Sequence, residues 1–212
     1  MSKKAINQAL KAYSDIIKSQ QEIGREHDPT PTEFFAVISS TIGQASNSSA
    51  DFLMNSLRIL EAITTEASQT IVRGQFRSLS SVYLQIITMS TDNASLLKVA
   101  LAALGSLLYV QETNDGIWST VQALQCINVL LTFLEDANIK LRKCAIDQLQ
   151  RLLTLHYNNS NGNNGNGKGG ALRTYILDYC CSIFQSCSRN DYKRSLYIIL
   201  FVWFIKPLNR DF

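Results

Sequence analysis

Apolar residues recur at helical spacing along almost the whole chain, and only short polar turns interrupt them. Helix breakers are scarce, with 3 prolines and 10 glycines among 212 residues. No stretch alternates between apolar and polar residues as a strand does. The pattern predicts an all-α chain of about nine helices, over roughly residues 3–23, 31–45, 50–66, 69–89, 96–111, 117–134, 139–155, 171–187 and 190–205.

The best-marked helix start lies at the sequence TPTE, residues 30–33. Thr30 and Glu33 have the spacing of a capping box, in which each side chain accepts a hydrogen bond from the other residue's backbone amide. Pro31 would occupy the first helical position, where its missing N–H is not needed. We therefore expect a helix from Pro31, with a buried stripe made of Phe34, Phe35, Ile38 and Ile42.

The same spacing predicts inward-facing stripes in the other helices. Ile16 belongs to the predicted stripe of segment 3–23, Ile71 to that of segment 69–89, and Val121 to that of segment 117–134. In segment 139–155 the predicted stripe consists of Leu141, Ala145, Leu149 and Leu152.

Helices are predicted to follow one another in pairs. Segments 117–134 and 139–155 with their turn span about 40 residues, a period typical of HEAT and armadillo repeats. We therefore predict a HEAT/armadillo-like α-solenoid of antiparallel helices, in which each pair packs only on its neighbours. A compact helical bundle would have the same periodicity and is the alternative fold.

Composition divides the chain into three regions. Residues 1–157 form the predicted helical-repeat region, and residues 158–170 are an asparagine/glycine insertion that cannot bury surface and is predicted to be disordered. Residues 171–212 are predicted to continue the solenoid with a further helix pair. The apolar run at 196–205 is about half the length that a membrane span needs. Because nothing after Phe212 covers this run, we expect the chain to be part of a longer protein.

Charge and cysteine content limit the partners and the compartment. The chain has 20 basic and 17 acidic residues, too even a balance to direct the whole molecule onto nucleic acid, so any basic surface must be local. The amino terminus lacks the apolar region of a secretion signal, which favours the nucleus or cytoplasm. The five cysteines lack disulfide-type spacing and are expected to be reduced and mostly buried, namely Cys126, Cys144, Cys180, Cys181 and Cys187.

Motifs for catalysis or cofactor binding are weak. Residues 162–168 match the start of a phosphate-binding loop, but Gly169 follows where Ser or Thr would hold magnesium. His27 and His156 have no metal-ligand spacing around them. No nucleophile lies in a recognisable catalytic motif. We therefore predict no enzyme activity, metal, cofactor or small-molecule substrate, and keep an enzyme in a helical fold as the third hypothesis.

Residues 134–153 resemble a HEAT-type repeat, which has an acid in the turn, then an arginine and an alanine early in the second helix. Asp136, Arg142 and Ala145 occupy these places. The resemblance implies that Asp136 and Arg142 bond across the turn and to the same pair in a stacked neighbour. It also implies that Ala145 lets the two helices approach closely.

Basic residues near this turn are the candidate contacts for a partner or RNA. Lys140, Lys143 and Arg151 form the first group. Asp147 lies four residues from both Lys143 and Arg151, so a solvated stripe that compensates its own charge is the alternative interpretation. A second candidate group borders the predicted last helix and consists of Arg189, Lys193 and Arg194.

Three stretches are similar to the ribosomal RNA-processing protein twelve family: PTPTEFFAVISSTI (29–42), LLKVALAALGSLLYVQETNDGIWS (96–119) and ANIKLRKCAIDQLQRLL (137–153). The similarity covers roughly residues 30–157 and more faintly 171–205, although the asparagine/glycine insertion is not part of the family pattern. It implies the amino-terminal portion of a non-catalytic scaffold in pre-rRNA processing and nuclear export.

The same similarity implies binding to pre-ribosomal RNA, proteins and transport factors. It also implies a nuclear or nucleolar location, with shuttling to the cytoplasm, and no membrane partner. Another helical-repeat adaptor, such as a nuclear transport receptor or a trafficking scaffold, is the alternative function, because these proteins share the repeat pattern of residues 134–153.

Overall fold

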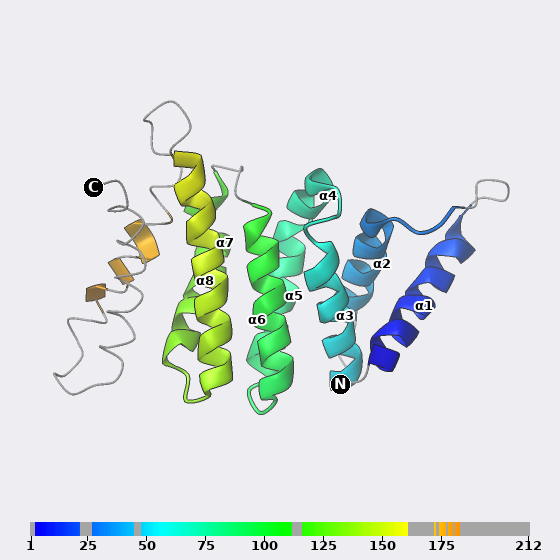
Figure 1. The fold of residues 1–212 in the computed structure, drawn as a ribbon, viewed down its shortest axis with the longest axis horizontal. Helices are drawn as coiled ribbons and strands as arrows, with labels where there is room; N and C mark the ends of the chain where they lie inside the picture. The colour runs from blue at the N-terminus through cyan, green and yellow to red at the C-terminus, as the bar shows by residue number, and fades with distance from the viewer. Residues whose placement is uncertain are drawn as a thin grey trace.

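The computed structural model describes residues 3–21, 27–44, 48–111, 116–160, 172, 174–176, 178–179 and 181–182, with the backbone alone for 155–160. All regular structure in these ranges is helical (Figure 1). The helices are α1 (Lys3–Gln20), α2 (Pro31–Gln44), α3 (Ala50–Ile63), α4 (Gln69–Gly74), α5 (Phe76–Met89), α6 (Ala94–Tyr109), α7 (Val121–Thr132) and α8 (Ile139–Ser160), with 3₁₀ turns η1 (Ile117–Ser119) and η2 (Phe133–Glu135).

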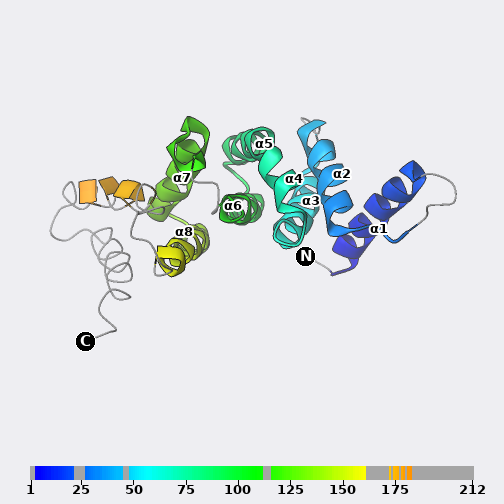
Figure 2. The same cartoon turned by 90° about the horizontal axis from the view of Figure 1, so that it is seen from above.

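The helices form two stacked layers. Helices α2, α5 and α7 lie side by side in one layer, here called layer A, and α3, α6 and α8 form the other, layer B (Figure 2). Helix α2 pairs with α3, α5 with α6, and α7 with α8, while α1 packs on both α2 and α3. This arrangement of helix pairs is an α-solenoid, which confirms the predicted fold over the compact bundle.

Side-chain caps define several of the helix starts. The predicted capping box is present: the Glu33 amide donates to Thr30 Oγ1 at 3.3 Å, and the Thr30 amide donates to Glu33 Oε2 at 2.8 Å. The bonds from Thr30 hold the pKa of the Glu33 carboxyl below its usual value. Three further helices have an N-cap side chain that accepts from a backbone amide, supplied by Ser49, Asn93 and Thr120.

Three predicted helices differ most in their boundaries. Segment 69–89 is divided at Gln75 into α4 and α5, and the short α4 is attached to α6 because Arg73 Nε donates to the Val110 carbonyl at 3.1 Å. Segment 117–134 contains α7 between two 3₁₀ turns, since Thr120 is extended and caps the helix at Val121. Helix α8 continues to Ser160, three residues into the predicted insertion. The remainder of that insertion lies outside the described residues.

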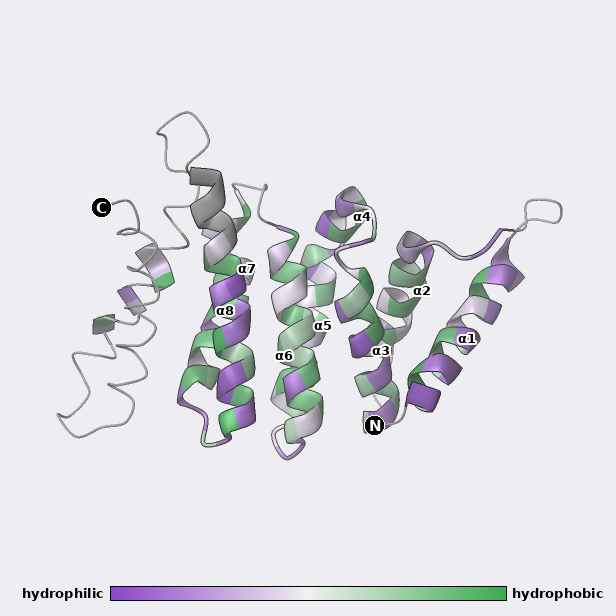
Figure 3. Cartoon of the chain, in the orientation of Figure 1, coloured by the Kyte–Doolittle hydropathy of each residue, from purple (hydrophilic) through white to green (hydrophobic). Residues whose placement is uncertain are grey.

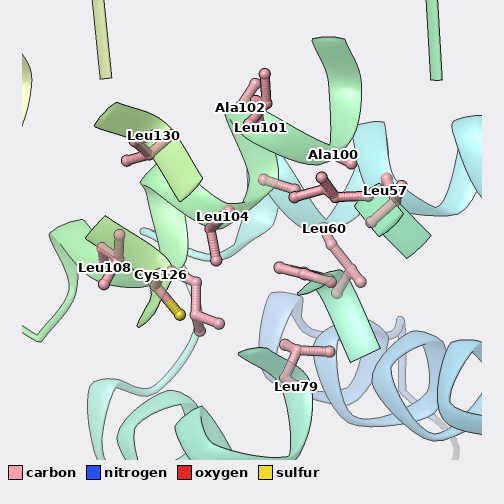
Figure 4. Packing of buried hydrophobic residues seen from close by; sticks show 14 of the residues in the cluster. Leu57, Leu60, Leu79, Ala100, Leu101, Ala102, Leu104, Leu108, Cys126 and Leu130 are labelled. Carbon is pink, nitrogen blue, oxygen red and sulfur yellow. The ribbon is translucent and has the colours of Figure 1, made fainter. Parts of the chain in front are cut away.

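Helix α6 is the centre of the solenoid. It contacts α3, α5, α7 and α8 and is buried on most sides, and Lys98 is the one charged residue in its largely apolar sequence. Figure 4 shows Leu101, Leu104 and Leu108 of α6 among side chains of α3, α5 and α7. By contrast, α1 lies at the end of the array and is largely hydrophilic in Figure 3. A polar outer helix is typical of the capping unit of a solenoid.

Three residues of the predicted buried stripes are exposed. Ile16 is 41% exposed, Ile71 is 40% exposed and Val121 is 72% exposed. The first belongs to the end helix α1, the second to the short α4, and the third is the first residue of α7, so each lies where few neighbouring helices are available. The prediction for segment 139–155 is confirmed, because Leu141, Ala145, Leu149 and Leu152 are all buried.

The cysteine prediction is confirmed at two positions and wrong at one. Cys126 and Cys144 are free thiols in the core, whereas Cys181 is free and exposed. Cys180 and Cys187 lie outside the described residues. Of segment 171–187, Leu172 and Ile176 are buried, and the Tyr175 hydroxyl donates to Asn128 Oδ1 of α7 at 2.6 Å. Segment 190–205 is outside the described part of the chain. None of the described helices has the length and apolar character that a membrane span requires.

Candidate binding face on layer B

The turn before α8 is closed by hydrogen bonds to its main chain. Asp136 Oδ1 accepts from the Asn138 amide at 2.7 Å, and Asn138 Oδ1 accepts from the Lys140 amide at 2.9 Å. Arg142 Nη1 donates to the carbonyl oxygens of Asp136 at 2.6 Å and Ala137 at 3.1 Å. Arg142 therefore reaches across the turn, and the acceptor on Asp136 is its main-chain carbonyl oxygen.

Arg142→Ala is expected to lower the free energy of unfolding by about 1 kcal/mol, because two main-chain carbonyls lose a charged donor. Lys143→Ala is the matched control, since Lys143 is the exposed neighbour on α8 and should change stability by less than about 0.5 kcal/mol. Urea unfolding followed by circular dichroism measures both. Equal effects of the two substitutions would reject a structural role for Arg142.

The three candidate contacts on α8 have different surroundings. Lys140 and Lys143 are exposed. Arg151 is half-buried: its guanidinium lies 4.0 Å from the centroid of the Tyr109 ring, and Nη1 donates to Ser106 Oγ at 3.2 Å. Arg151 thus joins α8 to α6 through a cation–π contact and a hydrogen bond. The second group, consisting of Arg189, Lys193 and Arg194, lies outside the described residues.

The stacking of helices in layer B brings two further basic residues near Arg151, and neither was predicted as a contact from the sequence. Arg58 of α3 and Lys98 of α6 both lie close enough to Glu61 of α3 to interact with its charge, and so does Arg151 of α8. Arg58 and Lys98 are each the only basic residue in a largely apolar helix, so no cluster of basic residues in the sequence indicated them. They come together because α3, α6 and α8 are neighbours in layer B.

We call this surface the layer B face, defined by the basic residues Arg58, Lys98, Lys140, Lys143 and Arg151 and the acidic residues Glu61 and Asp147. On α8 the basic residues and Asp147 follow one another at helical spacing, along one stripe. Layer A differs sharply in charge. Helix α2 has one charged residue, Glu33, helix α5 has one, Arg77, and α7 has none.

The buried thiols are in their neutral forms. Burial raises the pKa of Cys126 to about 12 and that of Cys144 to about 11, and a neutral thiol is a poor nucleophile. Cys144 Sγ lies 3.4 Å from the Lys98 carbonyl oxygen and donates to it, which links α8 to α6. A depression of about 210 Å³ between the ends of α2, α3, α5 and α6 has no charged residue in its lining. The described side chains form no group of three or more potential metal ligands.

Comparison with known families identifies the repeat. A family model described as "RRP12-like, N-terminal HEAT repeats" matches residues 3–162, which is more than half of the chain. No match was found among curated proteins or solved structures. The matched region contains the whole of α1 to α8. The chain therefore belongs to the RRP12-like family, and its solenoid is a HEAT-repeat scaffold of the kind that functions in ribosome biogenesis.

Proposed function

We propose that this chain acts in pre-rRNA processing and nuclear export of ribosomal subunits as a non-catalytic scaffold, and that its layer B face binds the phosphate backbone of precursor RNA. The family supports the general role in ribosome biogenesis. The proposed partners are pre-ribosomal particles together with nuclear transport factors, and the proposed location is the nucleus and nucleolus with shuttling to the cytoplasm. The proposal includes no cofactor.

The observation that carries the RNA proposal is the availability of the basic side chains. Within the described part of the chain, the side chains of Arg58, Lys98, Lys140 and Lys143 make no hydrogen bond or ion pair. Their charges are therefore not committed to holding the fold together. Phosphate contacts of this kind release counterions and make the affinity depend on salt.

Removal of three lysines tests the proposal. The triple variant Lys98→Gln, Lys140→Gln and Lys143→Gln should bind single-stranded RNA roughly tenfold more weakly at low salt, and its log–log salt slope should be smaller by about 2. Fluorescence anisotropy with a labelled RNA of about 15 nucleotides measures both quantities. The control is Arg77→Gln, which removes one exposed cation from layer A and should leave the affinity unchanged.

Recovery of the tagged protein from its own cells tests the biological role. Sequencing of the associated RNA and mass spectrometry of the associated proteins should find precursor ribosomal RNA with assembly factors. Transport or trafficking proteins without that RNA would instead favour the alternative adaptor function. A triple variant that binds RNA as tightly as the natural chain would contradict the assignment of the layer B face.

A further inference from the structure

Glu61 lies among cations from three helices without pairing with any of them. Arg58 is one turn away on α3, Lys98 is on α6 and Arg151 is on α8, and all three attract the Glu61 carboxylate. Yet Glu61 makes no ion pair within 4.0 Å and no hydrogen bond to another described residue. Its half-buried position therefore has a solvation cost that no direct bond to Arg58, Lys98 or Arg151 offsets.

The cations near Glu61 differ in how they are held. Arg151 is already held by the Tyr109 ring and by Ser106 Oγ. The backbone carbonyl of Lys98 is engaged by Cys144, which attaches that residue's main chain to α8. The fold thus keeps the Glu61 carboxylate near Arg58 and Lys98, whose side chains remain available to an external anion.

We propose that Glu61 regulates anion binding on the layer B face: its carboxylate competes with an RNA phosphate for the field of Arg58, Lys98 and Arg151, and its neutralisation strengthens binding. This inference rests on the proposed function, because it concerns the same face. Its physical basis is that a carboxylate and a phosphate of the same sign repel each other, most strongly where the site is partly removed from water.

The direction of the pH effect follows from the groups that face Glu61. Burial raises the pKa of the Glu61 carboxyl, and the nearby Arg151, Arg58 and Lys98 only partly offset this. Tyr83 and Cys144 also lie near Glu61, and burial raises the pKa of each, so both stay neutral at acidic and neutral pH. Asp147 of α8 is the other carboxylate of the face. As the pH falls, Glu61 gains a proton at a higher pH than an ordinary glutamate, and RNA affinity should rise.

Two charge-neutralising variants separate this role from a general charge effect. At neutral pH and low salt, Glu61→Gln should bind a single-stranded RNA of about 15 nucleotides about tenfold more tightly than the natural chain. Asp147→Asn removes the same charge from an exposed position of the same face and should increase the affinity by about twofold or less. As the pH falls from neutral, the affinity of Glu61→Gln should change less than that of the natural chain, whereas Asp147→Asn should keep the pH dependence of the natural chain.

Each outcome decides a different point. Equal affinities for Glu61→Gln and Asp147→Asn, or an unchanged pH profile in Glu61→Gln, would overturn the regulatory role while RNA binding by the face stands. Failure of both the natural chain and Glu61→Gln to bind RNA would overturn the proposed function and the inference together. Thermal unfolding checks that the Glu61→Gln variant is folded. Because the substitution removes a half-buried charge that forms no ion pair with Arg58, Lys98 or Arg151, the melting temperature should equal or exceed that of the natural chain.

Discussion

Leu104→Ala is expected to lower the free energy of unfolding by about 3–5 kcal/mol. Leu104 lies in the middle of α6 and is completely buried, and Figure 4 shows it among side chains from neighbouring helices. The substitution removes apolar contacts and leaves a cavity that helices fixed on several sides cannot collapse to fill. The loss is comparable to much of the stability of an ordinary domain.

Urea unfolding of the full chain, followed by circular dichroism, measures this loss. Met89→Ala is the control, because Met89 ends α5 and is 67% exposed, so its truncation should change stability by less than about 0.5 kcal/mol. A similar small effect for Leu104→Ala would mean that α6 is not the central helix of the fold.

Gly105→Ala is expected to lower the free energy of unfolding by about 2 kcal/mol, although alanine is the better helix former. A methyl group on Gly105 would lie 2.6 Å from Gln148 Cγ and 2.7 Å from Cδ, so most of the Gln148 side chain would have to move. Gln148 belongs to α8, and the glycine thus allows α8 to pack closely on α6. The expected loss is the cost of this overpacking minus the gain in helix propensity.

Two variants test that explanation. Gly43→Ala should raise stability by up to about 1 kcal/mol, because Gly43 is also helical but a methyl group there would meet no atom within 4 Å. Adding Gln148→Ala to Gly105→Ala should recover part of the lost stability, since it removes the clashing side chain. The same sign for Gly105→Ala and Gly43→Ala, or no recovery in the double variant, would show that contact with Gln148 is not the cause.

Much of the fold could be predicted from periodicity and capping. The Thr30–Glu33 box was recognisable because its four residues interact with one another, and the stripe of α8 because each of its residues lies on one helix face. Val121 and Ile71 were misjudged, since burial depends on which helices stand beside a position. The break at Gln75 also escaped prediction, because a contact from Arg73 to Val110 helps to position α4.

Only part of the candidate site could likewise be predicted from the sequence. Lys140, Lys143 and Arg151 were predicted because they lie at helical spacing within one segment. The sequence alone did not show that Arg151 is held by Tyr109 and Ser106, residues 42 and 45 positions earlier in the chain. It also did not place Arg58, Lys98 and Glu61 on the same face as α8.

The sequence by itself determined the helices, their approximate order in pairs, the repeat turn at Asp136 and Arg142, and membership of the RRP12-like family. These properties follow from interactions over a few residues, whose geometry a helix imposes. Only the tertiary structure decided that charge gathers on layer B and is nearly absent from layer A, and that Glu61 lies near Arg58, Lys98 and Arg151 without forming an ion pair with any of these three. The reason is physical: charges act through distance in space, and the stacking of α3, α6 and α8 brings together residues that are about 90 positions apart in the chain.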